Sequence, residues 1–292
     1  GRSGWGRACD PGSSPVTSTP TAPTAPPVGA GTITRVQARP AGFSRDLGSV
    51  AIRALRQTRR EPEAFVPALI VPIFFYVMNV AALSKVTHIA AGVDFKAFEL
   101  PLSVVFAVTG VSRASALVVD IQDGYFDRLV MTPVRRLALL LGLMTADFVL
   151  VMCLALPVLV VGLAMGVRFS TGIAGMAVFV VLCGTWGLVF TGLPYAIALK
   201  TGNPSAVNAS FVLFFPITFL TTAFVPKADL QGWLAAVATV NPMTYILAGL
   251  RSLILVGWDG TALLETVAAV LGFGLVSISL ALLALRGRIS RR

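Results

Sequence analysis

The segment 120–136 concentrates charge in a sequence of 292 residues, of which only 12% are charged overall. Three carboxylates, Asp120, Asp123 and Asp127, recur at intervals of three and four residues, which places them on one face of a helix. Apolar side chains occupy the other faces, namely Tyr125, Phe126, Leu129 and Val130. A short amphipathic helix of this composition is suited to docking into a groove on a soluble protein, and a solvated connector is the alternative.

The three aspartates also superficially fit a site in which carboxylates hold Mg²⁺ and a diphosphate, as in an intramembrane prenyltransferase. The later acidic residues are scattered instead of forming a second cluster: Asp147, Asp229, Asp259 and Glu265. An ion-coupled secondary transporter is a further alternative, because such carriers hold ionisable groups within the membrane. Its candidates, Arg113 and Asp147, lie near span ends, where snorkelling toward the interface accounts for them.

Metal and nucleotide sites have little support in the sequence. The only histidine is His88, and Cys9, Cys153 and Cys183 form no C-x-x-C pair. No G-x-x-x-x-G-K-[ST] phosphate loop occurs either. We therefore expect no catalytic residue, no metal ligand and no ATPase site in this chain.

The elements around the charged segment are predicted to be membrane spans. Hydrophobic residues make up 56% of the chain and the mean hydropathy is +0.84, which leaves too little charged surface for a soluble domain. Apolar runs of about 20 residues match a hydrocarbon layer roughly 30 Å thick, and they lack strand-like alternation. The runs predict six transmembrane helices at 64–84, 100–119, 137–161, 173–199, 205–225 and 263–285. The expected fold is an all-α polytopic membrane protein.

The distribution of basic residues predicts the orientation, because Lys and Arg collect on the cytoplasmic side of a membrane. The net charge of +10 is therefore interpreted as a topology signal and not as a nucleic-acid surface. With both termini, the basic tail 286–292 and the loops 120–136 and 200–204 inside, all but five of the 23 Lys and Arg residues lie on that side. The exceptions are Lys85, Lys96, Arg168, Lys227 and Arg251. An even number of spans follows.

Three regions lie between or before the spans. Residues 1–43 are rich in Pro, Thr and Ser and cannot bury enough apolar area to offset their ordering entropy, so we expect a disordered tail. Residues 44–62 place apolar and arginine side chains on opposite sides of a helix, which predicts an amphipathic interface helix. Residues 226–257 hold two short apolar pieces split by Asn241-Pro242, which predict a re-entrant helix pair, with a further span as the alternative.

Two groups of motifs follow one another along the chain. The first is D-x-x-x-G-x-x-D-R-L-x-x-x-P-x-x-R, beginning at Asp120. The second comprises Phe224-Val225-Pro226, Trp233-Leu234, Asn241-Pro242-Met243-Thr244-Tyr245 and Leu250-Arg251. Over residues 45–285 their order and spacing resemble those of ABC-2 type transporter permeases, the family that includes daunorubicin and doxorubicin resistance exporters.

The resemblance implies a transport subunit that moves a hydrophobic drug-like, polyketide or lipid-like molecule out of a bacterium. It implies two copies of a cytoplasmic ABC ATPase as partners, which carry ATP and Mg²⁺, while this chain binds no cofactor itself. A second permease, identical or paralogous, and membrane lipid are the other expected partners. The expected location is the bacterial plasma membrane, with both termini cytoplasmic.

The resemblance also implies roles for individual residues. A coupling helix would contact the ATPase through Asp120, Asp123, Gly124, Tyr125, Phe126, Asp127, Arg128, Leu129, Pro133 and Arg135. The re-entrant pair would form an external gate with Pro226, Trp233, Asn241, Pro242, Tyr245 and Arg251. Polar residues within the spans are weaker candidates for a substrate path: Asn79, Thr109, Thr218 and Thr222.

Overall fold

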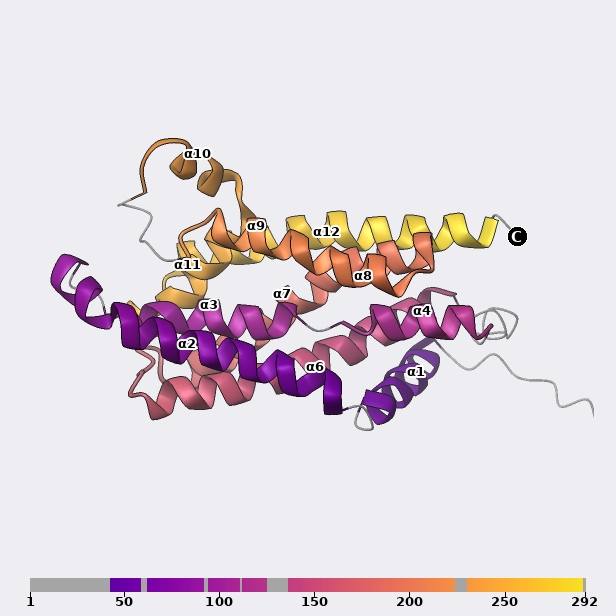
Figure 1. Cartoon of the computed structure of the whole chain (residues 1–292), viewed down its shortest axis with the longest axis horizontal. Coiled ribbons are helices and arrows are strands. Elements are labelled where there is room, and N and C mark those ends of the chain that lie inside the picture. Colours follow the sequence, from indigo (N-terminus) through magenta and orange to yellow (C-terminus); the bar gives the residue numbers. More distant parts are fainter. Residues whose placement is uncertain are drawn as a thin grey trace, which may run out of the picture. The chain divides into compact units, whose positions relative to one another are not determined.

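The computed structural model describes residues 43–58, 62–91, 94–110, 112–124, 136–223 and 230–290, which all lie in one compact unit spanning residues 40–292. The described residues form helices joined by short connections, and no strand occurs among them (Figure 1). The predicted all-α polytopic fold is therefore confirmed. The expected tail at 1–43 lies outside the described residues, except for Phe43.

Five of the described segments are long and apolar enough to cross a membrane. Four of them are continuous helices: α2 (Pro62–Ala91), α6 (Arg136–Ala164), α7 (Gly172–Thr201) and α12 (Gly260–Ser290). The fifth combines α3 (Phe95–Thr109) with α4 (Ala114–Gln122). Helices satisfy their backbone amides and carbonyls internally, as a chain in lipid must. Counting the bent pair α10–α11 as one more span raises the total to six.

The second span differs from the continuous helix expected at 100–119. Helix α3 ends at Thr109, whose hydroxyl donates to the carbonyl of Val105 (2.6 Å), and α4 begins only at Ala114. Between them the amide of Arg113 donates to the carboxylate of Asp147. A hydropathy pattern does not reveal such an interruption, because it ignores where each amide finds its acceptor.

The segment expected to span at 205–225 is shorter than predicted. It consists of α8 (Pro204–Ser210), the 3-10 turn η1 (Phe211–Leu213) and α9 (Phe214–Phe219), with 7, 3 and 6 residues. At 1.5 Å per residue this run falls short of a hydrocarbon layer about 30 Å thick. After α9 the hydroxyl of Thr221 donates to the carbonyl of Thr218, a local side-chain bond that competes with helix continuation.

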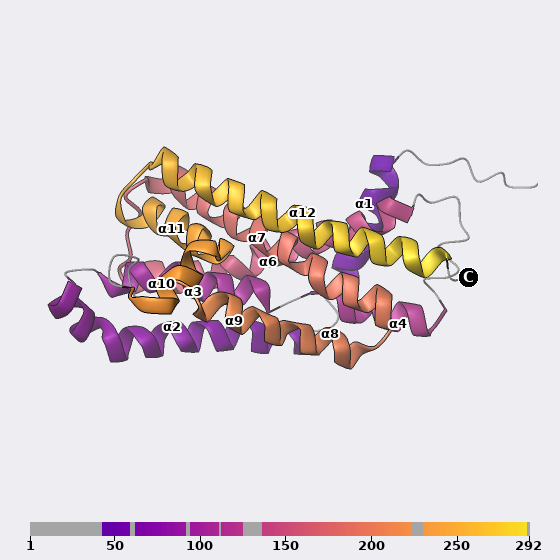
Figure 2. The same ribbon diagram turned by 90° about the horizontal axis from the view of Figure 1, so that it is seen from above.

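The predicted break at Asn241-Pro242 separates α10 (Gly232–Val240) from α11 (Pro242–Leu255), which meet at 82°. Asn241 caps α11 because its side-chain oxygen accepts the amide of Met243 at 3.0 Å. Pro242 takes the first helical position, where its missing N–H costs no helical bond. Both helices lie at the same end of the bundle (Figures 1 and 2), the arrangement of a broken span or a re-entrant pair.

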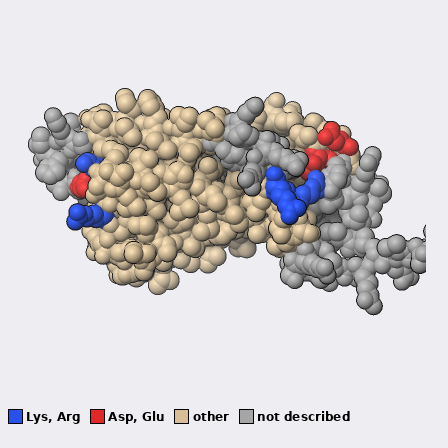
Figure 3. Space-filling model, turned by 90° about the horizontal axis from the view of Figure 1, so that it is seen from below, with Lys and Arg blue, Asp and Glu red and all other residues tan. Residues whose placement is uncertain are grey.

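The bundle has two chemically different ends. Helix α1 (Phe43–Thr58), α4 and the C-terminal end of α12 lie at one end, and α10 and α11 lie at the other (Figures 1 and 2). We call the former the basic end, because its described exposed or half-buried side chains include Arg53, Arg56, Lys200, Arg286 and Arg288. On the face in Figure 3 the charged residues that are coloured lie toward the two ends, and the tan surface between them carries no charge, as expected of a membrane bundle.

Helix α1 packs against α6. A Cβ on Gly142 of α6 would lie only 2.8 Å from the Cβ of Val50, so the glycine lets the two backbones approach closely. Ala51, Ala54 and Ala146 are buried in the same contact. The apolar side of the predicted interface helix therefore faces the bundle, and its exposed side includes Arg53.

Candidate functional site

A buried carboxylate lies where the second span is interrupted. Asp147 of α6 is fully buried and accepts the hydroxyl of Tyr195 from α7 at 2.9 Å. It also accepts the backbone amide of Arg113 (3.3 Å) and the hydroxyl of Ser112 (3.5 Å). A buried carboxylate is tolerated when donors converge on it, as here. Through these bonds Asp147 of α6 connects the residues between α3 and α4 to α7.

The guanidinium of Arg113 continues this network to the interface helix. It is only 7% exposed and donates to the carbonyl of Ala54 in α1 at 2.6 Å. The expected snorkelling of Arg113 and Asp147 toward water is therefore wrong, because both side chains point into the bundle and have protein partners. Together they connect α1, α4, α6 and α7 near the basic end.

Helix α4 leads from this network into the predicted coupling helix. Gln122 donates to the carbonyl of Gly202 after α7 (3.0 Å), and Ser115 donates to the side chain of Asn208 in α8 (3.2 Å), so both contacts attach α4 to the region that follows α7. Asp120 is half-buried and Asp123 is exposed.

The predicted single helix across 120–133 is wrong at Gly124, because α4 ends at Gln122 and Gly124 has a φ of 68°. Asp120 therefore lies in α4, and Asp123 follows the end of that helix. The other residues expected to contact the ATPase lie outside the described part of the chain: Tyr125, Phe126, Asp127, Arg128, Leu129, Pro133 and Arg135.

A second polar cluster lies toward the α10–α11 end. Glu99 of α3 is 1% exposed and accepts the amide of Asn79 from α2 at 2.8 Å. One turn earlier the hydroxyl of Tyr76 donates to the carbonyl of Lys96 (3.0 Å), which attaches the same two helices. Asn79 was predicted as a candidate for the substrate path from its polarity alone. Glu99 was not predicted as a site residue, because the predicted span began at residue 100.

Arg251 of α11 joins three segments of this end. Its guanidinium donates to the carbonyls of Phe98 (3.0 Å), Thr222 (2.6 Å) and Ala223 (2.8 Å), and its charge lies 3.4 Å from the centroid of the Phe98 ring. The side chain is 7% exposed, so these contacts replace its water. The hydroxyl of Thr222 also faces the guanidinium at 3.3 Å.

The other residues predicted for the external gate fall into two groups. Asn241 donates to the carbonyls of Ile217 (2.7 Å) and Leu220 (3.0 Å), and thus fastens the α10–α11 corner to the end of α9. Tyr245 donates to the carbonyl of Thr239 across the same corner at 2.6 Å. Trp233, by contrast, is 70% exposed and stands apart, and Pro226 lies outside the described residues.

Thr109 and Thr218 were expected to line a substrate path. Both are buried, and the hydroxyl of Thr109 bonds within its own helix. The hydroxyl of Thr218 has no hydrogen-bond partner among the described residues. Of the four path candidates, Asn79 and Thr222 belong to the polar contacts around Glu99 and Arg251.

Comparisons with known proteins agree with this architecture. Residues 45–255 match the family described as ABC-2 type transporter. A daunorubicin resistance ABC transporter permease of Streptomyces coeruleorubidus is 25% identical over 237 residues, which cover 77% of this chain and 80% of that protein. A probable doxorubicin resistance permease of Mycobacterium tuberculosis is 22% identical over 201 residues, covering 68% and 73%. A putative transport permease of Cyanophora paradoxa is 22% identical over 220 residues, covering 72% and 74%.

Proposed function

This chain belongs to the ABC-2 type transporter family, and on that premise we propose that it exports a hydrophobic molecule with energy from a separate ATPase subunit. The observation that carries the proposal is the family match over residues 45–255. The drug-like class of substrate is suggested by relatives named for resistance to daunorubicin and doxorubicin. A polyketide or lipid-like molecule has the same apolar character and belongs to the proposal.

The largely apolar interior supports a substrate of this kind. The large buried cluster around α7 consists of aromatic and aliphatic side chains, among them Trp186, Phe179 and Phe190. A highly charged substrate would lose its hydration on entering such a bundle, with few fixed charges to replace it. The buried charges near the two ends already have protein partners, as Asp147 and Arg251 illustrate.

The network around Asp147 supports a mechanical route from the ATPase. Helix α4 begins directly after Arg113, whose amide donates to Asp147, and its C-terminal end enters the segment 120–136. In our proposal, closure of two ATPase subunits moves this segment, and α4 transmits the movement to α1, α6 and α7. The bundle then alternates between inward-open and outward-open states. ATP and Mg²⁺ are held by the ATPase, and this chain binds no cofactor.

The proposed assembly contains two ATPase copies and a second permease, either identical or paralogous. Its location is the plasma membrane of a bacterium, with both termini in the cytoplasm, because Lys and Arg favour that side. The basic end then faces the ATPase, and α10 and α11 lie toward the exterior.

Copurification tests the proposed coupling. The tagged chain is expressed together with a candidate ABC ATPase subunit from the same organism, and the ATPase recovered per permease is measured. We expect the double variant Asp127→Ala, Arg128→Ala to recover at least about tenfold less ATPase, equivalent to ~1.4 kcal/mol of binding. Arg286→Ala removes an exposed charge at the same end and serves as the control, with unchanged recovery expected.

Full recovery of the ATPase by the double variant would refute the coupling role of 120–136. Export by wild-type vesicles that proceeds without any ATPase would refute the larger proposal and favour an ion-coupled carrier.

A further inference from the structure

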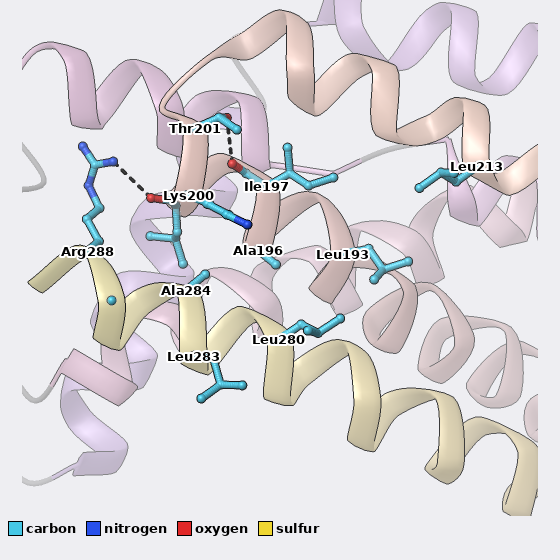
Figure 4. Close-up of a pocket in the computed structure, with 12 residues that line it drawn as sticks. Leu193, Ala196, Ile197, Lys200, Thr201, Leu213, Leu280, Leu283, Ala284 and Arg288 are labelled. Atoms are coloured by element: carbon cyan, nitrogen blue, oxygen red, sulfur yellow. Dashed lines mark hydrogen bonds between the residues drawn. The ribbon is translucent and has the colours of Figure 1, made fainter.

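A groove of about 650 Å³ lies between α7, α12 and η1 at the basic end. Its volume falls within the range of about 300–1,000 Å³ typical of small-molecule sites. Leu193 of α7, Leu280 of α12 and Leu213 of η1 line the part farther from the helix ends (Figure 4). Lys200 and Arg288 line the part where α7 and α12 end. The groove is therefore apolar along most of its length and basic at one end.

The described lining of the groove does not neutralise the two basic side chains. Among the described residues that line it, none is acidic. Arg288 donates one bond, to the carbonyl of Leu199 at 3.1 Å, while its buried Nε has no hydrogen-bond partner in the described structure. Lys200 is exposed, and its ammonium makes no hydrogen bond or ion pair with any residue of the described ranges. The negative C-terminal ends of the α7 and α12 dipoles explain why basic side chains are favourable here. They do not explain why an apolar groove adjoins these side chains.

The groove opens on the outer surface of the bundle. Leu213, Leu280 and Leu283 are 52%, 44% and 61% exposed, and they lie on membrane-spanning or apolar helical segments. In a bilayer these side chains meet hydrocarbon, while Lys200 and Arg288 lie nearer to the headgroups. A ligand that matches both parts must combine an apolar chain with an anionic group.

We propose that this groove binds an acidic phospholipid, with the phosphate at Lys200 and Arg288 and an acyl chain along Leu193, Leu213 and Leu280. Basic pockets between membrane helices on the cytoplasmic side are suited to acidic headgroups. A free phosphate would leave the apolar part of the groove unused. The choice of leaflet rests on the proposed orientation, whereas binding itself requires neither the ATPase nor transport.

Native mass spectrometry of the purified full-length chain in detergent tests this proposal. The chain is titrated with phosphatidylglycerol and, separately, with phosphatidylcholine, and bound lipid is counted. We expect preferential retention of phosphatidylglycerol and about fivefold weaker binding in Lys200→Gln and in Arg288→Gln, from the attraction of one basic residue to an acidic membrane lipid. Arg286→Gln removes an exposed charge outside the groove and should bind like the wild type.

A second variant tests the groove without changing charge. Gly287 lines it, and a Cβ there would meet no atom within 4 Å, so Gly287→Leu can occupy the space without a backbone clash. This variant should lose the tightly bound lipid. Gly272→Leu is the control, because Gly272 has equally open surroundings on α12 but does not line the groove.

Three outcomes would overturn the proposal. Equal lipid retention in Lys200→Gln, Gly287→Leu and both controls would show that the lipid binds elsewhere. Displacement by glycerol phosphate alone would assign the basic end to a free anion. Lipid bound to monomers but absent from dimers would show that a second copy of the chain covers the groove. Loss of ATPase copurification with intact lipid binding would refute only the proposed coupling.

Discussion

At the scale of single residues, Arg251 shows how a cation is accommodated inside an apolar bundle. Its donors reach backbone carbonyls of α3 and of the turn after α9, where the chain leaves regular structure. The carbonyls of Thr222 and Ala223 lie beyond the end of α9, outside any helix, and would be costly to bury alone. Arg251 therefore supplies hydrogen bonds that hold an irregular segment at depth.

Arg251→Lys should destabilise the protein although it keeps the positive charge. A lysine ammonium is a compact donor and cannot reproduce the planar fork that contacts Phe98, Thr222 and Ala223 together. We expect the free energy of unfolding to fall by roughly 2–4 kcal/mol, measured by denaturant titration in detergent micelles. Arg168→Lys, at an exposed loop position, should change it by less than about 0.5 kcal/mol. Equal effects at both positions would contradict the role given to Arg251.

Tyr195→Phe should weaken the network around Asp147. The substitution removes one donor from a fully buried carboxylate and leaves the ring in place, so we expect a loss of roughly 2 kcal/mol in the same titration. Tyr245→Phe removes a bond to a backbone carbonyl at an exposed site and should cost about 1 kcal/mol or less. A larger effect at Tyr245 than at Tyr195 would show that Asp147 does not depend on this hydroxyl.

The sequence indicates some of these residues and misses others for a physical reason. Arg251 and Asn241 were predicted from their place in the motif series, and both occupy junctions in the structure. Glu99 was missed and Asp147 was interpreted as snorkelling, because spans predicted from apolar runs treat charged residues as lying near the span ends. The partners that make burial tolerable come from α2 for Glu99 and from α7 for Asp147, and no local pattern identifies them.

At the scale of elements, α7 and α12 approach closely at a pair of small residues. A Cβ on Gly192 would lie 2.9 Å from the backbone of Ser277, and the Ser277 hydroxyl donates to the carbonyl of Val189. Small residues that let backbones approach, with a hydroxyl bond across them, are typical of helix association in membranes. This contact positions the two helices that form the proposed lipid groove.

Gly192→Ala should therefore separate α7 from α12. The added methyl meets backbone atoms that cannot rotate away, so we expect a loss of roughly 2 kcal/mol in stability. Gly272→Ala is the matched control on α12, because its methyl meets nothing within 4 Å and alanine favours a helix by up to about 1 kcal/mol. Thermal unfolding in detergent should rank Gly272→Ala at or above the wild type and Gly192→Ala below it. The reverse order would contradict the close contact.

Long helices were more predictable than their interruptions. The expected spans at 137–161 and 173–199 fall inside α6 and α7, because length and apolarity are properties of the local sequence. The break between α3 and α4 depends on Asp147, which lies more than 30 positions away. Just after the early end of α9, the hydroxyl of Thr221 donates to the carbonyl of Thr218. Interruptions of this kind are decided by hydrogen-bond partners that a hydropathy pattern does not contain.

At the scale of the whole molecule, the described helices and their connections distribute between two opposite ends of the bundle. Helix α1 and the end of α12 lie at the same basic end, while the connection between α6 and α7 lies with α10 and α11 at the other (Figures 1 and 2). That connection is fastened to α11, since Ser170 donates to the carbonyl of Ile254 at 2.8 Å. If the bundle spans a membrane, residues at its two ends must therefore face opposite sides of that membrane.

Cysteine labelling in intact cells tests the predicted orientation. Cys9, Cys153 and Cys183 are replaced by alanine, and one cysteine is introduced by Arg168→Cys or Arg286→Cys, both exposed positions at opposite ends. Because basic residues collect inside, a membrane-impermeant maleimide should label position 168 at least tenfold faster than position 286, and permeabilisation should equalise the rates. Labelling of 286 but not 168 before permeabilisation would invert the bundle, place the segment 120–136 outside and remove any ATP-driven role for it.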